Sequence, residues 1–101
     1  MQLFDLRVVE AAGGFCRTER PHFSWKLRSE KKDTKQAAFE LCVLQDGKKV
    51  SSAKGEGECA YILAEGEALL PRTRYEVRVT AEDNHGERAE ASLVFETDKL
   101  S

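Results

Sequence analysis

Apolar and polar residues alternate with a period of two in short segments along the whole chain. Successive side chains of a β-strand point to opposite faces of a sheet, so this period predicts strands with one buried and one solvated face. The clearest segments are residues 4–8, 23–28, 39–44, 75–82 and 91–96. No helical stripe of useful length accompanies them, and residues 64–70 are expected to form one helical turn at most. The pattern therefore predicts an all-β chain.

Turn signals separate these segments and reveal two weaker strands. Residues 48–52 follow Asp46-Gly47, a dipeptide that favours a tight hairpin, and residues 59–64 are apolar on both faces. Residues 29–36 are expected to form a charged loop, residues 54–58 a flexible turn, and residues 83–87 the last hairpin. About seven short strands in a chain of 101 residues are typical of an antiparallel β-sandwich. We expect one domain covering residues 1–101.

Composition limits the partners of this chain. The 16 Lys and Arg residues are balanced by 18 Asp and Glu residues, which argues against a nucleic-acid partner because no basic surface is concentrated. No segment approaches the ~20 apolar residues of a membrane span, so no membrane partner is expected. Asp5 and Arg7 interrupt the first segment, which excludes a signal-peptide pattern there. If Met1 is the native start, we expect a cytoplasmic protein.

The cysteines predict neither a disulfide framework nor a metal centre. Cys16, Cys42 and Cys59 are odd in number and form no C-x-x-C pair. We expect reduced thiols that behave as small buried hydrophobes. Nothing else in the sequence indicates a cofactor, so no cofactor and no metal ligand are predicted.

Residues 69–75 (LLPRTRY) place Leu, Pro, Thr and Tyr at alternate positions just before a strand. This spacing is similar to the tyrosine corner of Greek-key sandwiches. The Tyr75 hydroxyl is expected to bond to backbone a few residues upstream, Pro71 to stiffen the crossover, and Leu69 to close the end of the core. The prediction for this stretch is a structural role.

The position of Trp25 separates two kinds of sandwich. Immunoglobulin domains carry Cys on their second and sixth strands and Trp on the third. Here the second clear strand carries Trp25, and neither this strand nor the Tyr75 strand contains Cys. Together with the tyrosine corner, this arrangement resembles fibronectin type III. The predicted fold is therefore a fibronectin type III or immunoglobulin-like antiparallel β-sandwich.

Five segments extend this resemblance over residues 3–100: 5–8 (DLRV), 21–27 (PHFSWKL), 36–43 (QAAFELCV), 74–86 (RYEVRVTAEDNHG) and 95–97 (FET). They resemble the fibronectin-III-like N-terminal module of bacterial α-L-rhamnosidases. Residues 13–20 depart from that pattern, because the family often carries a Pro-Leu-Gly-type segment there. The resemblance implies a non-catalytic accessory module whose partners are the neighbouring domains of a glycoside hydrolase. The catalytic acids of that family lie in a separate helical barrel.

The residues themselves offer no convincing active site. Glycoside hydrolysis needs two carboxyl groups held across a sugar. Glu56 and Glu58 fall in a Gly-rich turn, and Glu82 and Asp83 fall at a strand end where solvation is expected. His22, His85 and Ser24 also lack a catalytic arrangement; the histidines are read as solvated or capping residues. No catalytic residue is therefore predicted.

The alternative function is a free-standing carbohydrate- or protein-binding module. Sugar sites on sandwiches usually offer exposed aromatic platforms. Most aromatic side chains here are expected to point inward: Phe23, Trp25, Phe39, Tyr75 and Phe95. The loops offer only Phe15 as a platform, with Tyr61 as a weaker addition, so any glycan contact is expected to be weak. A generic fibronectin type III module of an unrelated surface protein is a third, weaker alternative.

Overall fold

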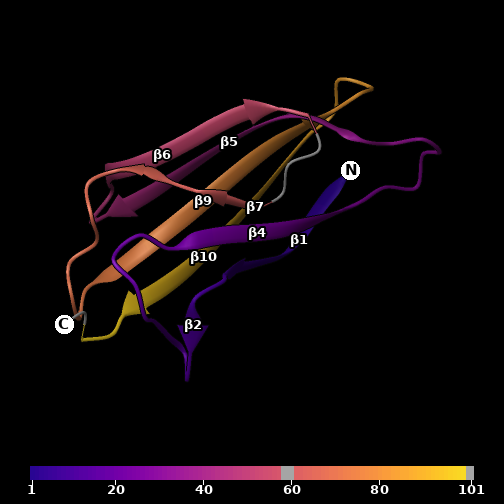
Figure 1. Cartoon of the computed structure of the whole chain (residues 1–101). Helices are drawn as coiled ribbons and strands as arrows, with labels where there is room; N and C mark the ends of the chain where they lie inside the picture. The colour runs from indigo at the N-terminus through magenta and orange to yellow at the C-terminus, as the bar shows by residue number, and fades with distance from the viewer. Residues whose placement is uncertain (58–60, 100–101) are drawn as a thin grey trace.

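The computed structural model describes residues 1–57 and 61–99, and this part of the chain is built from strands without a helix (Figure 1). The strands are β1 (Gln2–Val8), β2 (Ala11–Ala12), β3 (Phe15–Cys16), β4 (His22–Arg28), β5 (Gln36–Gln45), β6 (Lys48–Glu56), β7 (Tyr61–Leu63), β8 (Glu65–Gly66), β9 (Arg74–Asp83) and β10 (Arg88–Thr97). The seven strands of three residues or more correspond to the seven expected segments.

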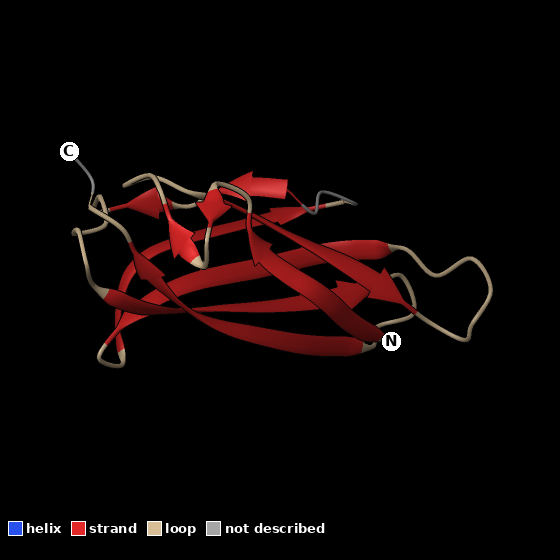
Figure 2. Ribbon diagram, turned by 90° about the horizontal axis from the view of Figure 1, so that it is seen from below, coloured by secondary structure: helices blue, strands red, loops and turns tan. Residues whose placement is uncertain are grey.

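The strands form two sheets that face each other as a sandwich (Figure 2). The small sheet has the order β1-β4-β7, and the large sheet has the order β2-β3-β10-β9-β5-β6-β8. Every pairing is antiparallel except that of β3 with the end of β10, which is parallel. The predicted antiparallel β-sandwich is confirmed, with this one short parallel pairing as an addition. Residues 11–16 lack a period-two pattern, so their two short strands were not expected.

The core lies between the sheets and is filled by the inward side of the alternation. On β9, Tyr75, Val77, Val79 and Ala81 are all buried, while the residues between them face outward. The five aromatic side chains predicted to point inward are all buried: Phe23, Trp25, Phe39, Tyr75 and Phe95. Burying a large apolar side chain stabilises a fold by about 1.5–3 kcal/mol, so these side chains provide much of the driving force.

A buried hydrogen bond fixes the position of Trp25 between the sheets. Its indole Nε1–H donates to Gln36 Oε1 across 2.8 Å, and Gln36 Nε2 donates to the carbonyl oxygen of Gly57 at 3.1 Å. The Trp25 ring also packs against Phe39, with ring centroids 5.3 Å apart. Gln36 is therefore a buried residue at the start of β5, and its assignment to the charged loop 29–36 was wrong. An indole N–H that leaves water needs such an acceptor.

Several turn predictions are confirmed, and the one for residues 54–58 is wrong in part. Asp46 and Gly47 join β5 to β6 with φ angles of 51° and 80°, the left-handed values that a tight hairpin requires. Residues 83–87 close the last hairpin between β9 and β10. By contrast, β6 continues through Glu56, so residues 54–56 are strand rather than turn. The stretch 64–70 has no helical turn but contains β8, which pairs with β6.

The tyrosine corner is present. The Tyr75 hydroxyl accepts a hydrogen bond from the backbone N–H of Leu70 at 2.8 Å, and Leu69 is buried at the edge of the core. The crossover between β8 and β9 is thereby attached to the start of β9.

Candidate functional site

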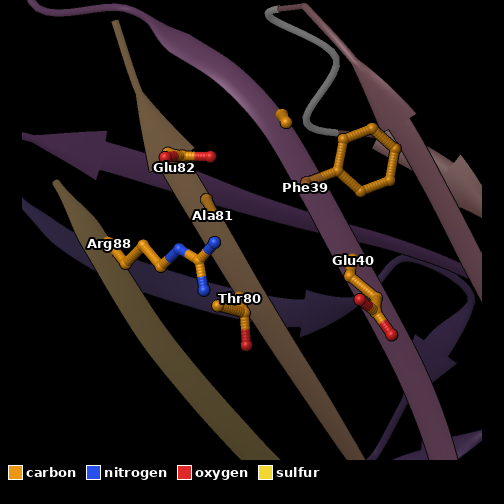
Figure 3. A pocket seen from close by; sticks show the side chains of 7 residues that line it. Phe39, Glu40, Thr80, Ala81, Glu82 and Arg88 are labelled. Carbon is orange, nitrogen blue, oxygen red and sulfur yellow. The ribbon is translucent and has the colours of Figure 1, made fainter. Parts of the chain in front are cut away.

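A hollow lies on the outer face of the large sheet, where β5, β9 and β10 run side by side (Figure 3). It has a volume of about 410 Å³ and is lined by Ala38, Phe39, Glu40, Thr80, Ala81, Glu82 and Arg88. Glu82 and Arg88 are direct neighbours on the antiparallel pair β9–β10. This hollow is a shallow depression over a sheet surface.

The charged groups of this hollow do not converge. The exposed Glu40 carboxylate turns away from Arg88, which extends over β9 (Figure 3). A glycosidase holds two carboxyl groups at a fixed separation across the sugar and raises the pKa of one of them. An exposed Glu side chain on an open sheet face does not have such a fixed position. The chemistry that this hollow supports is weak polar contact with a ligand or a neighbouring domain.

The other candidate acids occupy exposed or structural positions. Glu56 ends β6 and is exposed, while Glu58 lies outside the described residues. Asp83 differs from the expectation of a solvated carboxylate, because it is only 2% exposed. Its Oδ1 accepts hydrogen bonds from the backbone N–H groups of His85 and Glu87, each at 2.9 Å. Asp83 therefore holds the β9–β10 turn together.

Two opposing effects act on the pKa of Asp83. Burial alone raises this pKa, and its Oδ2 has no hydrogen-bond partner among the described residues. The two backbone N–H donors and the charge of a protonated His85 stabilise the carboxylate, and the net result is a pKa below the usual value. A carboxyl group with a lowered pKa cannot serve as a general acid near neutral pH.

His22 is engaged by a carboxylate and an aromatic ring. Glu10 accepts hydrogen bonds from the His22 backbone N–H and lies against its ring Nδ1, both at 2.7 Å. The His22 ring stacks on Tyr61, with centroids 5.0 Å apart. The expectation of a solvated or capping His22 is therefore incomplete, because sequence patterns did not reveal Glu10 or Tyr61 as its neighbours. His85 is exposed in the last turn, as expected.

Ser24 and the cysteines carry no arrangement for nucleophilic catalysis. Ser24 lies on β4 between Arg7 of β1 and Tyr61 of β7. Cys16 is buried, as predicted, and Cys42 is only partly buried on the outer side of β5; Cys59 lies outside the described residues. Burial raises the pKa of both described thiols, which keeps them in the unreactive protonated form.

Phe15 and Tyr61, the two predicted platform residues, are indeed exposed. Their exposed fractions are 43% and 54%, but Phe15 belongs to β3 of the large sheet and Tyr61 to β7 of the small sheet. They therefore do not form one aromatic surface.

Within residues 1–57 and 61–99, no group of three or more His, Cys, Asp or Glu side chains is arranged to hold a metal ion. The same part of the chain contains no helix long and apolar enough to cross a membrane.

Comparison with known proteins assigns the chain to a family. A family model described as "Rha78A-like, N-terminal immunoglobulin domain" matches residues 10–101. The chain therefore belongs to this family of N-terminal immunoglobulin domains. This finding confirms the resemblance to the rhamnosidase module, since fibronectin type III and immunoglobulin domains share the sandwich architecture. No curated protein sequence matches the chain.

Two solved structures with the same sandwich are α-L-rhamnosidases. The enzyme from Dictyoglumus thermophilum matches 99% of this chain at 26% identity with a TM-score of 0.84. The enzyme from Streptomyces avermitilis, solved with L-rhamnose, matches 96% of this chain at 22% identity with a TM-score of 0.80, which shows a shared fold. This chain spans only 13% and 10% of the lengths of these two proteins.

Proposed function

We propose that this chain is an accessory domain of a multidomain α-L-rhamnosidase, in which it packs against neighbouring domains and fixes their spacing. The observation that carries this proposal is the family match over residues 10–101. The two similar rhamnosidases support it, because the matched part is a small fraction of each enzyme. Catalysis would then belong to other domains of the same polypeptide.

The carboxylates described above are consistent with this structural role. Asp83 organises a turn, Glu10 binds His22, and Glu87 pairs with Lys31 and with the amino group of Met1. Each of these carboxylates is already bound to its own part of the fold. None is left facing a second carboxyl group across a pocket, as glycoside hydrolysis requires.

The proposal is tested with the polypeptide that the native gene encodes. We expect an immunoblot band several times larger than the 11.4 kDa of this chain. The native polypeptide should hydrolyse an aryl α-L-rhamnoside, whereas residues 1–101 alone should not. Removing residues 1–99 should shorten the thermal half-life of the activity and leave KM nearly unchanged. A native protein of 11.4 kDa, or turnover by residues 1–101, would overturn the proposal.

A weak glycan contact is the second candidate function, and it is favoured by one observation. Tyr61 is 54% exposed and stacks on His22, so it offers the flat apolar surface on which a sugar ring can lie. Titration with rhamnose-containing oligosaccharides, followed by chemical shifts, should then show saturation that Tyr61→Ala abolishes. Equal responses in the two proteins would exclude this site.

A further inference from the structure

The end of β10 is held on both sides by hydrogen bonds. Thr97 is buried, its Oγ1 donates to the carbonyl oxygen of Leu70 at 2.5 Å, and the same oxygen accepts from the Thr73 N–H at 2.9 Å. The Thr97 N–H in turn donates to the Thr73 carbonyl oxygen at 2.9 Å. The crossover that contains the tyrosine corner is therefore hydrogen-bonded to Thr97, the last residue of β10.

Asp98 extends this hydrogen bonding one residue beyond β10. Its N–H donates to the Cys16 carbonyl oxygen at 2.8 Å, and its own carbonyl oxygen accepts from the Arg72 N–H at 3.2 Å. The Asp98 carboxylate also lies 3.4 Å from Arg17 Nε. Because the backbone is bound up to this residue, the direction in which the chain leaves the sandwich is fixed.

Three exposed apolar residues lie on the segments that meet at this exit. Val94 is 59% exposed, Leu70 55% and Phe15 43%. Val94 lies on the outer side of β10, Phe15 is the parallel neighbour of Glu96 on β3, and the Leu70 carbonyl binds Thr97. Single exposed apolar residues are common, but three beside one exit mark a surface suited to a partner.

An uncharged stretch lies at this end beside the charged pairs Arg17–Asp98 and Arg74–Glu96. Residues 11–15 (AAGGF) are all exposed and none is charged, although 34% of the chain is Asp, Glu, Lys or Arg. A second hollow, of about 290 Å³, lies next to Val94 and is lined by Leu44, Asp46, Gly47, Arg74, Tyr75, Glu76 and Val94. We call Phe15, Leu70, Val94 and residues 11–14 the exit surface.

The opposite end of the molecule carries the N-terminus. The chain measures 46 × 24 × 19 Å along its principal axes, and Figure 1 shows β2 and the C-terminus toward one end, away from the N-terminus. At the far end, Glu87 pairs with the amino group of Met1 and with Lys31. A segment that follows Lys99 spans at most about 3.6 Å per residue, so it reaches the exit surface before it can reach the opposite end.

We propose that the exit surface is where the next domain of the same polypeptide docks, and that residues 97–98 form a rigid joint between the two. This proposal rests on the proposed function, which supplies the following domain. The expected partner surface is apolar where it meets Phe15, Leu70 and Val94, and it carries polar groups around this centre that face the pairs Arg17–Asp98 and Arg74–Glu96. Because hydrogen bonds already hold residues 97–98, docking of the next domain costs little additional backbone entropy. This favours a fixed geometry of the two domains over a flexible linker.

Trypsin cleavage of the native polypeptide tests the joint, because Lys99 is a cleavage site at the exit. A docked domain should shield this site. The variant Phe15→Glu/Leu70→Glu/Val94→Glu should be cut after Lys99 at least about tenfold faster, since charged side chains oppose apolar docking. The matched control is Leu63→Glu, which changes an exposed residue on the small sheet and should leave the rate unchanged.

Cleavage after Arg78, in the middle of β9, serves as the folding control. Cleavage after Arg78 must stay slow in every variant. If the triple variant fails this control, the single variant Leu70→Ser replaces the triple variant in the same comparison. Equal cleavage after Lys99 in wild-type and variant polypeptides would overturn the docking surface while leaving the proposed function intact. A native polypeptide that ends near residue 101 would overturn both, and its mass would reveal this first.

Discussion

The Tyr75 hydroxyl and the Leu70 backbone N–H form a 2.8 Å hydrogen bond that ties the start of β9 to the preceding crossover. The Tyr75 ring is buried and stacks on Phe95, with centroids 5.8 Å apart. The carbonyl of the same Leu70 accepts from Thr97 at the end of β10. One tyrosine therefore supports both the crossover and the point where the chain leaves the sandwich.

Removing this hydroxyl should destabilise the fold without opening a large cavity. Tyr75→Phe keeps the ring but leaves the Leu70 N–H without its acceptor, which costs about 1–3 kcal/mol. Urea unfolding should show a lower midpoint with an unchanged m-value. The control is Tyr61→Phe, where the ring is mostly exposed and the change should stay within about 0.5 kcal/mol. Equal effects at the two positions would mean that the corner contributes nothing to stability.

Trp25 should be the most sensitive position of the core. Trp25→Ala removes the contact with Phe39 and the hydrogen bond to Gln36, and we expect a loss of about 3–5 kcal/mol. Trp25→Phe keeps part of the ring packing and should cost less. Chemical denaturation of both variants, with Val94→Ala as an exposed control, measures the difference. A Trp25→Ala protein as stable as Val94→Ala would contradict the observed packing.

Local patterns were sufficient to predict the long strands but not the contacts between distant segments. The alternation in residues 75–82 reflects burial on one face, which a sequence shows directly. Residues 11–16 carry no alternation; their two short strands pair with each other, and β3 also pairs with the end of β10. The pairing of Glu10 with His22 likewise depends on two segments meeting in the fold.

Asp83 and Gln36 show a second limit of sequence patterns. Both are polar residues near strand ends, where exposure is the ordinary expectation. The fold buries Gln36 because Trp25 needs an acceptor, and it buries Asp83 because the turn needs one for two N–H groups. Polar residues that satisfy buried donors are recognised only when their partners are known.

Gly66 should tolerate no larger residue. Its φ angle is 140°, and a Cβ built there would lie 2.7 Å from the carbonyl oxygen of Val50 and 2.8 Å from the Cα of Ser51. Gly66→Ala should therefore cost about 3 kcal/mol or more in unfolding free energy, from backbone strain and overlap together. Gly86→Ala is the matched control, since its φ is also positive, 83°, with open space around it. The control should cost only about 1–2 kcal/mol, and equal losses would contradict the predicted overlap.

The stability of the fold should depend on pH through Asp83. Its folded-state pKa is lowered, so its carboxylate stabilises the native state above the unfolded pKa of about 3.9. This contribution is lost as the pH falls through the folded value. We therefore expect the difference in Tm between wild type and Asp83→Asn to be largest near neutral pH and to shrink below about pH 4.

Calorimetric melting of the two proteins from pH 7 to pH 2.5 measures this dependence. The same comparison in a His85→Asn background controls for the imidazole, because a protonated His85 also lowers the pKa of Asp83. The shrinkage at low pH should persist there, since the backbone N–H groups of His85 and Glu87 are the stronger cause of the lowered pKa. A difference in Tm that widened toward low pH would mean that the folded-state pKa of Asp83 is raised. The turn would then not stabilise the Asp83 carboxylate, which would contradict this prediction.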